Sequence, residues 1–131
     1  GAEWVNVGVG QIRKVTSDLN ASQVEFESAD GNTVVKMNLD GCNSSLVDKQ
    51  PKRVLIAGAN CLISQRQDAG SKWSHEVLPD NFAVRFKTVQ AAARFLELLN
   101  DVCGLHLRQV VAMPANNLSV ILEKTETQTQ V

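Results

Sequence analysis

The stretch Phe82-Ala-Val-Arg-Phe-Lys-Thr88 decides the fold class, because the hydrophobic period changes directly after it. Within the stretch, apolar Phe82, Val84 and Phe86 alternate with small or charged residues. Alternation of this kind predicts a half-buried strand whose two aromatic rings face a core.

From Val89 onward the apolar residues recur three and four apart, which predicts an amphipathic helix. Its apolar stripe consists of Ala92, Phe95 or Leu96, Leu99 and Val102. Thr88 is a residue type favoured at a helix N-cap, and Gly104 stands where a C-terminal cap is expected.

Residues before this strand predict further short strands. Trp4 to Lys14 is an apolar pattern interrupted by glycines, as at a bend of a small barrel. Residues 24–28 and 35–39 alternate apolar and polar side chains around Asp30-Gly31, a dipeptide of tight hairpin turns. The apolar run 54–59 predicts a buried strand. The polar segments 40–51 and 64–72 predict loops.

The segment after the helix returns to a β-like composition. Residues 105–123 predict an extra hairpin with Asn116-Asn117 in its turn, and residues 125–130 are polar and are expected to fray. An extra hairpin here could extend the sheet, mediate self-association or contact a partner. We expect one domain over residues 1–131, mainly β with one C-terminal capping helix. A small antiparallel barrel and an α+β sandwich both fit the pattern.

Composition sets limits on function. The 131 residues include 13 Lys+Arg and 14 Asp+Glu, a net charge of −1, so no basic excess indicates nucleic acid or a membrane surface. Cys42, Cys61 and Cys103 are widely spaced and the chain has two histidines, which predicts neither disulfides nor a metal site. We expect an intracellular protein without signal peptide, cofactor or membrane span.

The chain resembles the Ran-binding domain family of the pleckstrin-homology superfold. The resemblance rests on the W-x3-G-x-G spacing of Trp4, Gly8 and Gly10, followed by Ile12, and on Phe82 to Thr88 with its two phenylalanines, Phe82 and Phe86, leading into a helix that has alanines and Phe95 at the family's positions. It covers residues 4 to about 102, so 105–123 lies beyond the family pattern.

The resemblance implies a pleckstrin-homology-like antiparallel β-barrel and no enzymatic activity. It also implies a protein partner, the GTP form of a Ran-type GTPase, and a place in the nucleus or at the nuclear pore. The strand where family members carry a basic pair here contains Glu25 and Glu27. The alternative is therefore a pleckstrin-homology-like adaptor that binds a peptide or strand of another protein.

Basic side chains are the candidates for contacting an acidic partner: Arg13, Lys14, Lys52 and Arg53. A solvated charged surface is the other interpretation of these residues. Trp73 lies in a polar segment, where an exposed ring would bind a partner and a buried ring would plug the end of the barrel. We expect the plug. The sequence shows no constellation of catalytic residues, which makes an enzyme the least favoured class.

Overall fold

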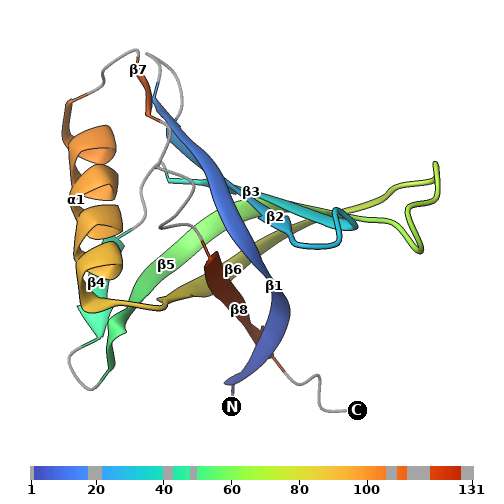
Figure 1. The fold of residues 1–131 in the computed structure, drawn as a ribbon, viewed down its shortest axis with the longest axis horizontal. Helices are drawn as coiled ribbons and strands as arrows, with labels where there is room; N and C mark the ends of the chain where they lie inside the picture. Colours follow the sequence, from blue (N-terminus) through green and yellow to red (C-terminus); the bar gives the residue numbers. More distant parts are fainter. Residues whose placement is uncertain are drawn as a thin grey trace.

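The computed structural model describes residues 2–17, 22–39, 43–47, 50–105, 109–111 and 119–127. It confirms a mainly antiparallel β-sheet domain with a single helix in this part of the chain (Figure 1). The elements in chain order are β1 (Ala2–Ser17), β2 (Ser22–Ser28), β3 (Thr33–Asn38), β4 (Asn43–Val47), β5 (Gln50–Gln65), β6 (Ser74–Phe86), α1 (Val89–Leu105), β7 (Gln109–Val111) and β8 (Ser119–Thr127).

The strands pair in the order β2-β3-β5-β6-β8-β1-β7, and β4 pairs with β5 beside this path. β1 is long enough to have several partners. Its residues 2–11 pair with β8, and its residues 10–17 pair with β2. β1 therefore joins β8 to β2, the strand at the start of the order. The pleckstrin-homology-like barrel itself stays a prediction.

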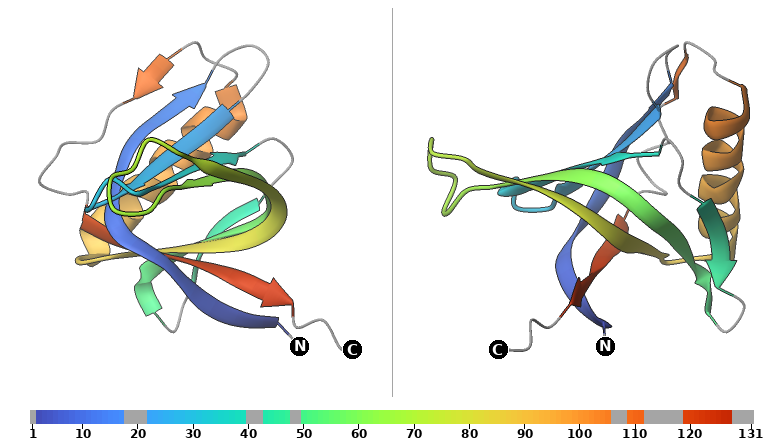
Figure 2. Two further views of the ribbon diagram at one scale, coloured as in Figure 1. Left: turned by 90° about the vertical axis from the view of Figure 1, so that its right-hand side faces the viewer. Right: turned by 180° about the vertical axis from the view of Figure 1, so that it is seen from behind.

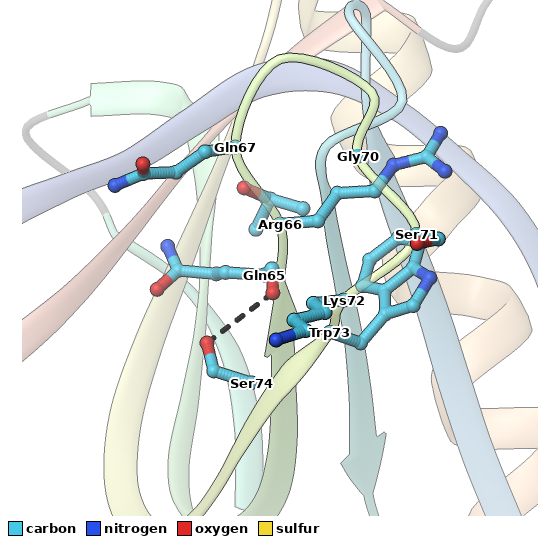
Figure 3. Close-up of a pocket in the computed structure, with 9 residues that line it drawn as sticks. Gln65, Arg66, Gln67, Gly70, Ser71, Lys72, Trp73 and Ser74 are labelled. Carbon is cyan, nitrogen blue, oxygen red and sulfur yellow. Dashed lines mark hydrogen bonds between the residues drawn. The ribbon is translucent and has the colours of Figure 1, made fainter.

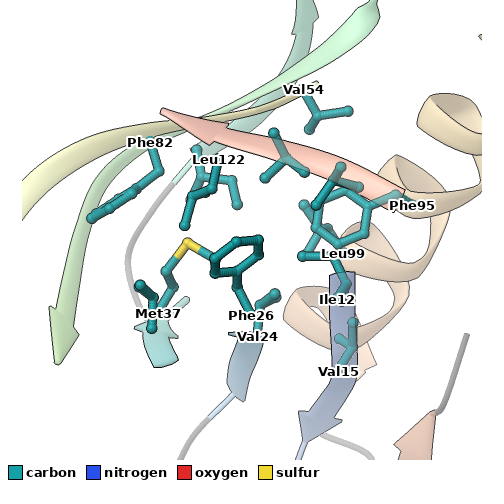
Figure 4. Close-up of a cluster of buried hydrophobic side chains, with 14 of the residues drawn as sticks. Ile12, Val15, Val24, Phe26, Met37, Val54, Phe82, Phe95, Leu99 and Leu122 are labelled. Carbon is teal, nitrogen blue, oxygen red and sulfur yellow. The ribbon is translucent and has the colours of Figure 1, made fainter. Parts of the chain in front are cut away.

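The core lies between the curved sheet and α1 (Figure 4). Phe82, Val84 and Phe86 of β6 are all at most 3% exposed, as their alternation predicted. On the helix, Phe95 and Leu99 are fully buried, and the rings of Phe86 and Phe95 lie 5.1 Å apart, centroid to centroid. Such a tilted aromatic pair contributes about 1 kcal/mol beyond the area it buries.

The predicted start of the helix is confirmed, because Ala91 N–H donates to Thr88 Oγ1 over 3.1 Å. The predicted end at Gly104 is wrong, since α1 continues through Gly104 to Leu105. A glycine in the last turn costs a helix only about 1 kcal/mol, which does not force it to end there. Among the described residues, no helix is long and apolar enough to cross a membrane.

The hairpin around Asp30-Gly31 is confirmed. β2 and β3 pair with Phe26 opposite Val35, and Gly31 has a φ of 75°, a conformation that costs glycine little. The strand at 54–59 is confirmed but is part of the longer β5. The loop predicted for 40–51 is partly wrong, because β4 forms there and β5 begins at Gln50.

β5 and β6 continue past Ala59 as a long hairpin, which we call the arm: residues 60–65 paired with 74–79, and the turn 66–73. β3 pairs with the other edge of residues 60–65, and Cys61 and Ile63 still belong to the core cluster. Figures 1 and 2 show the arm projecting to the side opposite α1. The loop predicted for 64–72 overlaps this turn. Polar residues at the outer end of the arm, Ser64 and Gln65 on β5 and Ser74 to Glu76 on β6, hid this part of the strands from a search for alternating apolar residues.

The extra hairpin predicted for 105–123 is wrong, because β7 and β8 do not pair with each other. Both pair with β1, and β8 also pairs with β6, so β8 lies between β1 and β6 and belongs to the main sheet. Fraying of residues 125–127 is wrong as well, since they pair with Ala2 to Trp4. The turn predicted at Asn116-Asn117 lies outside the described residues.

Candidate functional site

The outer surface of β5, β6 and β8 brings basic side chains together. Arg53 on β5 pairs in register with Arg85 on β6, and both neighbours Val54 and Val84 point into the core. Because side chains alternate along a strand, the two arginines lie on the outer face. Two exposed lysines are close to them in the chain: Lys52 precedes Arg53, and Lys87 lies two residues after Arg85. We call Trp4, Lys52, Arg53, Arg85 and Lys87 the outer basic patch.

Glu123 of β8 forms an ion pair with both arginines. Its Oε1 lies 3.7 Å from Nε of Arg53 and 3.5 Å from Nη2 of Arg85, whose N–H donates to it. One carboxylate between two guanidinium groups lowers their repulsion and leaves a net charge of about +1 on the three side chains. The side chain of Arg85 remains 43% exposed, so its charge is open to a partner.

Arg53 also contacts Trp4 on this surface. The carbon at the centre of its guanidinium lies 4.5 Å from the centroid of the Trp4 ring on β1. Since β6 and β8 lie between β5 and β1, the side chains of Arg53 and Trp4 meet over these two strands. This contact explains why Ala83, on the outer face of β6, is fully buried although it is not part of the core cluster.

Trp4, the first residue of the W-x3-G-x-G spacing, is not a core residue. Its ring does not seat the first strand in the core but lies on the outer face, 39% exposed, against a guanidinium. A cation held over an indole contributes about 1 kcal/mol at a partly exposed site. Trp4 thus fixes Arg53 and also presents aromatic surface to solvent.

Two shallow hollows lie on either side of Arg85. One, of about 220 Å³, is lined by Pro51, Lys52, Arg53 and Arg85. The other, of about 170 Å³, includes Arg85, Lys87 and the apolar Val9 and Ile121. Val9 is 52% exposed. Arginine and aromatic side chains beside apolar hollows are the composition found at the centres of protein interfaces.

Arg13 and Lys14 lie elsewhere, on β1 where it pairs with β2. Arg13 is already engaged: its guanidinium lies 3.2 Å from a carboxylate oxygen of Glu27 and 3.7 Å from one of Glu25. Glu25 also lies 3.9 Å from the amine of Lys36. The two acids that depart from the family pattern are therefore compensated within the fold. Lys14 pairs with Glu25 through its backbone, and its side chain is not among those described.

Trp73 does not plug the end of the sheet, contrary to expectation. It lies half-buried in the turn at the tip of the arm, where its ring stacks against Arg66 with 4.7 Å between guanidinium carbon and ring centroid (Figure 3). The arm is too long for residue 73 to reach the core. The polar neighbours of Trp73 in the sequence, Ser71, Lys72 and Ser74, are typical of a turn at the surface.

No protein-family model matches the chain, and the comparisons with curated proteins and with solved structures found no match either. The likeness to Ran-binding domains thus rests on the motifs of the sequence.

Several contacts could not be found from the sequence. Glu123 and Trp4 join the patch because β8 lies between β6 and β1, and no local pattern reveals that order. Ser64 Oγ and His75 Nδ1 lie 2.8 Å apart across the two strands of the arm, a contact between residues eleven apart. Within the described part of the chain, no three His, Cys, Asp or Glu side chains gather in an arrangement that could hold a metal ion.

Proposed function

We propose that this domain is a non-enzymatic protein-interaction module, similar to a Ran-binding domain, that binds the GTP form of a Ran-type GTPase or a related protein. The observation that supports the proposal best is the outer basic patch. It combines exposed arginine and lysine charges with an exposed indole and two adjoining hollows. A surface of this kind suits an acidic protein face carrying apolar side chains that enter the hollows.

Within the patch, the residues have different roles. Lys52, Arg85 and Lys87 supply charge toward solvent, and Arg53 is held by Trp4 and Glu123. Arg13 forms ion pairs with Glu25 and Glu27, so less of its charge is available to a partner than the sequence alone predicted. The Arg53 side chain is only 13% exposed, so we assign the partner contacts to Lys52, Arg85 and Lys87, with Trp4 as the aromatic contact and Arg53 as the residue that positions its ring.

Calorimetric titration with a Ran-type GTPase loaded with a non-hydrolysable GTP analogue tests the proposal, with the GDP form as control. We expect binding to the GTP form alone. The double variant Lys52→Gln, Arg85→Gln should bind about tenfold more weakly, or about 1.4 kcal/mol, with a smaller dependence on salt. Arg94→Gln, on the exposed side of α1, removes a charge far from the patch and should bind as the parent does.

A second candidate function is strand addition by a peptide of a different partner. Residues 74–79 of β6 pair with β5 on one side, whereas β8 pairs with β6 from Phe82 onward. Among the described strands, nothing pairs with the other edge of 74–79, where Val77 is 71% exposed. An extended peptide can bind such an edge through backbone hydrogen bonds. Absence of binding to both nucleotide forms of the GTPase would favour this candidate.

A further inference from the structure

The tip of the arm is built from two turns that Asn32 holds together. One turn joins β2 to β3 and the other joins β5 to β6. The Asn32 carbonyl accepts the backbone N–H of Arg66 over 2.9 Å. Its side-chain Oδ1 accepts two further hydrogen bonds, from Arg66 Nε over 3.3 Å and from the Ala69 N–H over 3.0 Å. The two turns therefore form one unit.

The turn that carries Asn32 is itself firmly held. Ser28 Oγ donates to Asp30 Oδ1 over 2.6 Å, and the Asn32 N–H donates to the same oxygen over 2.9 Å. These hydrogen bonds hold the pKa of Asp30 below its ordinary value, and the one from Ser28 has the largest effect. Ser28 Oγ in turn accepts the Thr33 N–H over 3.0 Å. Asn32 thus reaches the second turn from a fixed position.

The second turn is strained. Asp68 and Ala69 have φ values of 50° and 55°, and the Gly70 N–H donates to the Gln67 carbonyl over 2.8 Å. Positive φ at both central residues is the pattern of a type I′ turn, which usually contains glycine or asparagine. Alanine pays about 1 kcal/mol or more in this conformation. The Asn32 side chain holds the strained turn in place and so fixes the residues on either side of it.

Arg66 differs from the other arginines that the structure describes. Arg13, Arg53, Arg85 and Arg94 each form an ion pair with a glutamate. No described carboxylate lies within ion-pair distance of Arg66. Its guanidinium is nonetheless fixed, by the hydrogen bond from Nε to Asn32 and by the Trp73 ring. A fixed guanidinium without an acid is prepared for an external anion, since little side-chain freedom remains to be lost.

A groove of about 770 Å³ adjoins this arginine. Figure 3 shows Arg66 running toward Ser71 and Trp73, whereas the amine of Lys72 points away from the indole, toward Ser74. Gln65 and Gln67 also line the groove, but Figure 3 shows their amides pointing to the side opposite the Arg66 guanidinium. The guanidinium fork and the indole therefore lie together on one side, and the Lys72 ammonium and the amide groups lie on the other.

We propose that the tip groove binds an acidic peptide segment of a partner protein. Arg66 pairs with a carboxylate through its two terminal nitrogens, and Trp73 packs against an apolar side chain beside that carboxylate. A single-stranded nucleic acid fits less well. It presents a charge at every phosphate, whereas the groove offers two cations and the turn carries Asp68. The site lies at the far end of the arm from α1, so it does not depend on the function proposed for the outer basic patch (Figure 2).

Trp73 fluorescence in a Trp4→Phe background tests this proposal, because Trp73 is then the only tryptophan. The probe is a short synthetic peptide alternating aspartate, leucine and glutamate. Its control is the same peptide with asparagine and glutamine in place of the acids. We expect the acidic peptide to change the fluorescence in a saturable, salt-sensitive way, and the amide peptide to bind at least about tenfold more weakly.

Arg66→Gln should weaken the acidic peptide about tenfold, and Arg66→Lys should restore only part of the affinity, since lysine keeps the charge without the fork. Lys36→Gln removes an equal charge away from the tip and should leave binding unchanged. Equal binding of the two peptides, no binding of either, or full affinity in Arg66→Gln overturns the proposal. So does tighter binding of an oligothymidylate of matched charge, which would assign the groove to nucleic acid.

Discussion

At the scale of single residues, Gly10 shows how closely β1 and β2 approach each other. A Cβ added at Gly10 would lie 2.0 Å from the Glu27 carbonyl oxygen and 2.6 Å from the Ser28 Cα. Both are backbone atoms, which cannot move aside without breaking the pairing of the two strands. The W-x3-G-x-G spacing therefore contains at least one glycine that the fold requires.

Gly10→Ala should destabilise the domain by about 3 kcal/mol or more, because overpacking against backbone exceeds the usual cost in a core. Urea unfolding measures the change. Gly8→Ala is the matched control: a Cβ there would meet the Phe26 ring at 3.6 Å, an ordinary contact. It should alter the free energy of unfolding by less than about 1 kcal/mol. Equal effects of the two variants would contradict the close approach at Gly10.

The residue types in the sequence were enough to predict part of the candidate site, but not all of it. Lys52 and Arg53 were candidates because of their charge, and they do lie in a basic patch with Arg85. Arg13 had the same charge, but its acidic partners lie on another strand and became visible only with the pairing of β1 and β2. The charge of a side chain follows from the sequence, whereas its neutralisation by an ion pair depends on which strands are neighbours in the sheet.

At the scale of elements, α1 closes the core because a strand ends and a helix begins within two residues, at Lys87 and Thr88. Thr88→Ala removes the acceptor of the Ala91 N–H and should lower the free energy of unfolding by about 1 kcal/mol. Thr88→Ser keeps a hydroxyl and should lower it by less than half as much. Urea unfolding followed by circular dichroism distinguishes the two, and an equal loss in both would exclude the cap.

Elements with one buried face were predictable, and elements without one were not. The helix, the β2–β3 hairpin and the inner part of β6 have alternating or helical apolar patterns that reflect burial. At the outer end of the arm the side chains of both β5 and β6 are mainly exposed, as at Gln65 and Ser74. Paired strands with exposed side chains need no alternation of apolar and polar residues. The sequence therefore predicted a loop at residues 64–72 and strands that were shorter than β5 and β6.

At the scale of the whole molecule, β8 decides whether the sheet is continuous. The strand order makes it the element between β6 and β1, although the sequence pattern presented residues 105–123 as an addition. Val120 and Leu122 are at most 2% exposed and belong to the core cluster. Without β8, one edge of both β1 and β6 would lose its hydrogen-bond partners, and the core would open beside Val84.

Two neighbouring substitutions test this arrangement. Leu122→Asp places a carboxylate in the core, which costs more than about 4 kcal/mol and is comparable with the whole stability of a small domain. Ile121→Asp places the same carboxylate one residue away, on the outer face near Arg85. There it is solvated and lies close to a basic side chain. We expect the first variant to show no cooperative urea transition and the second to unfold much as the parent does. If both variants unfold alike, β8 does not occupy the sheet and the C-terminal segment is the addition that its sequence pattern indicated.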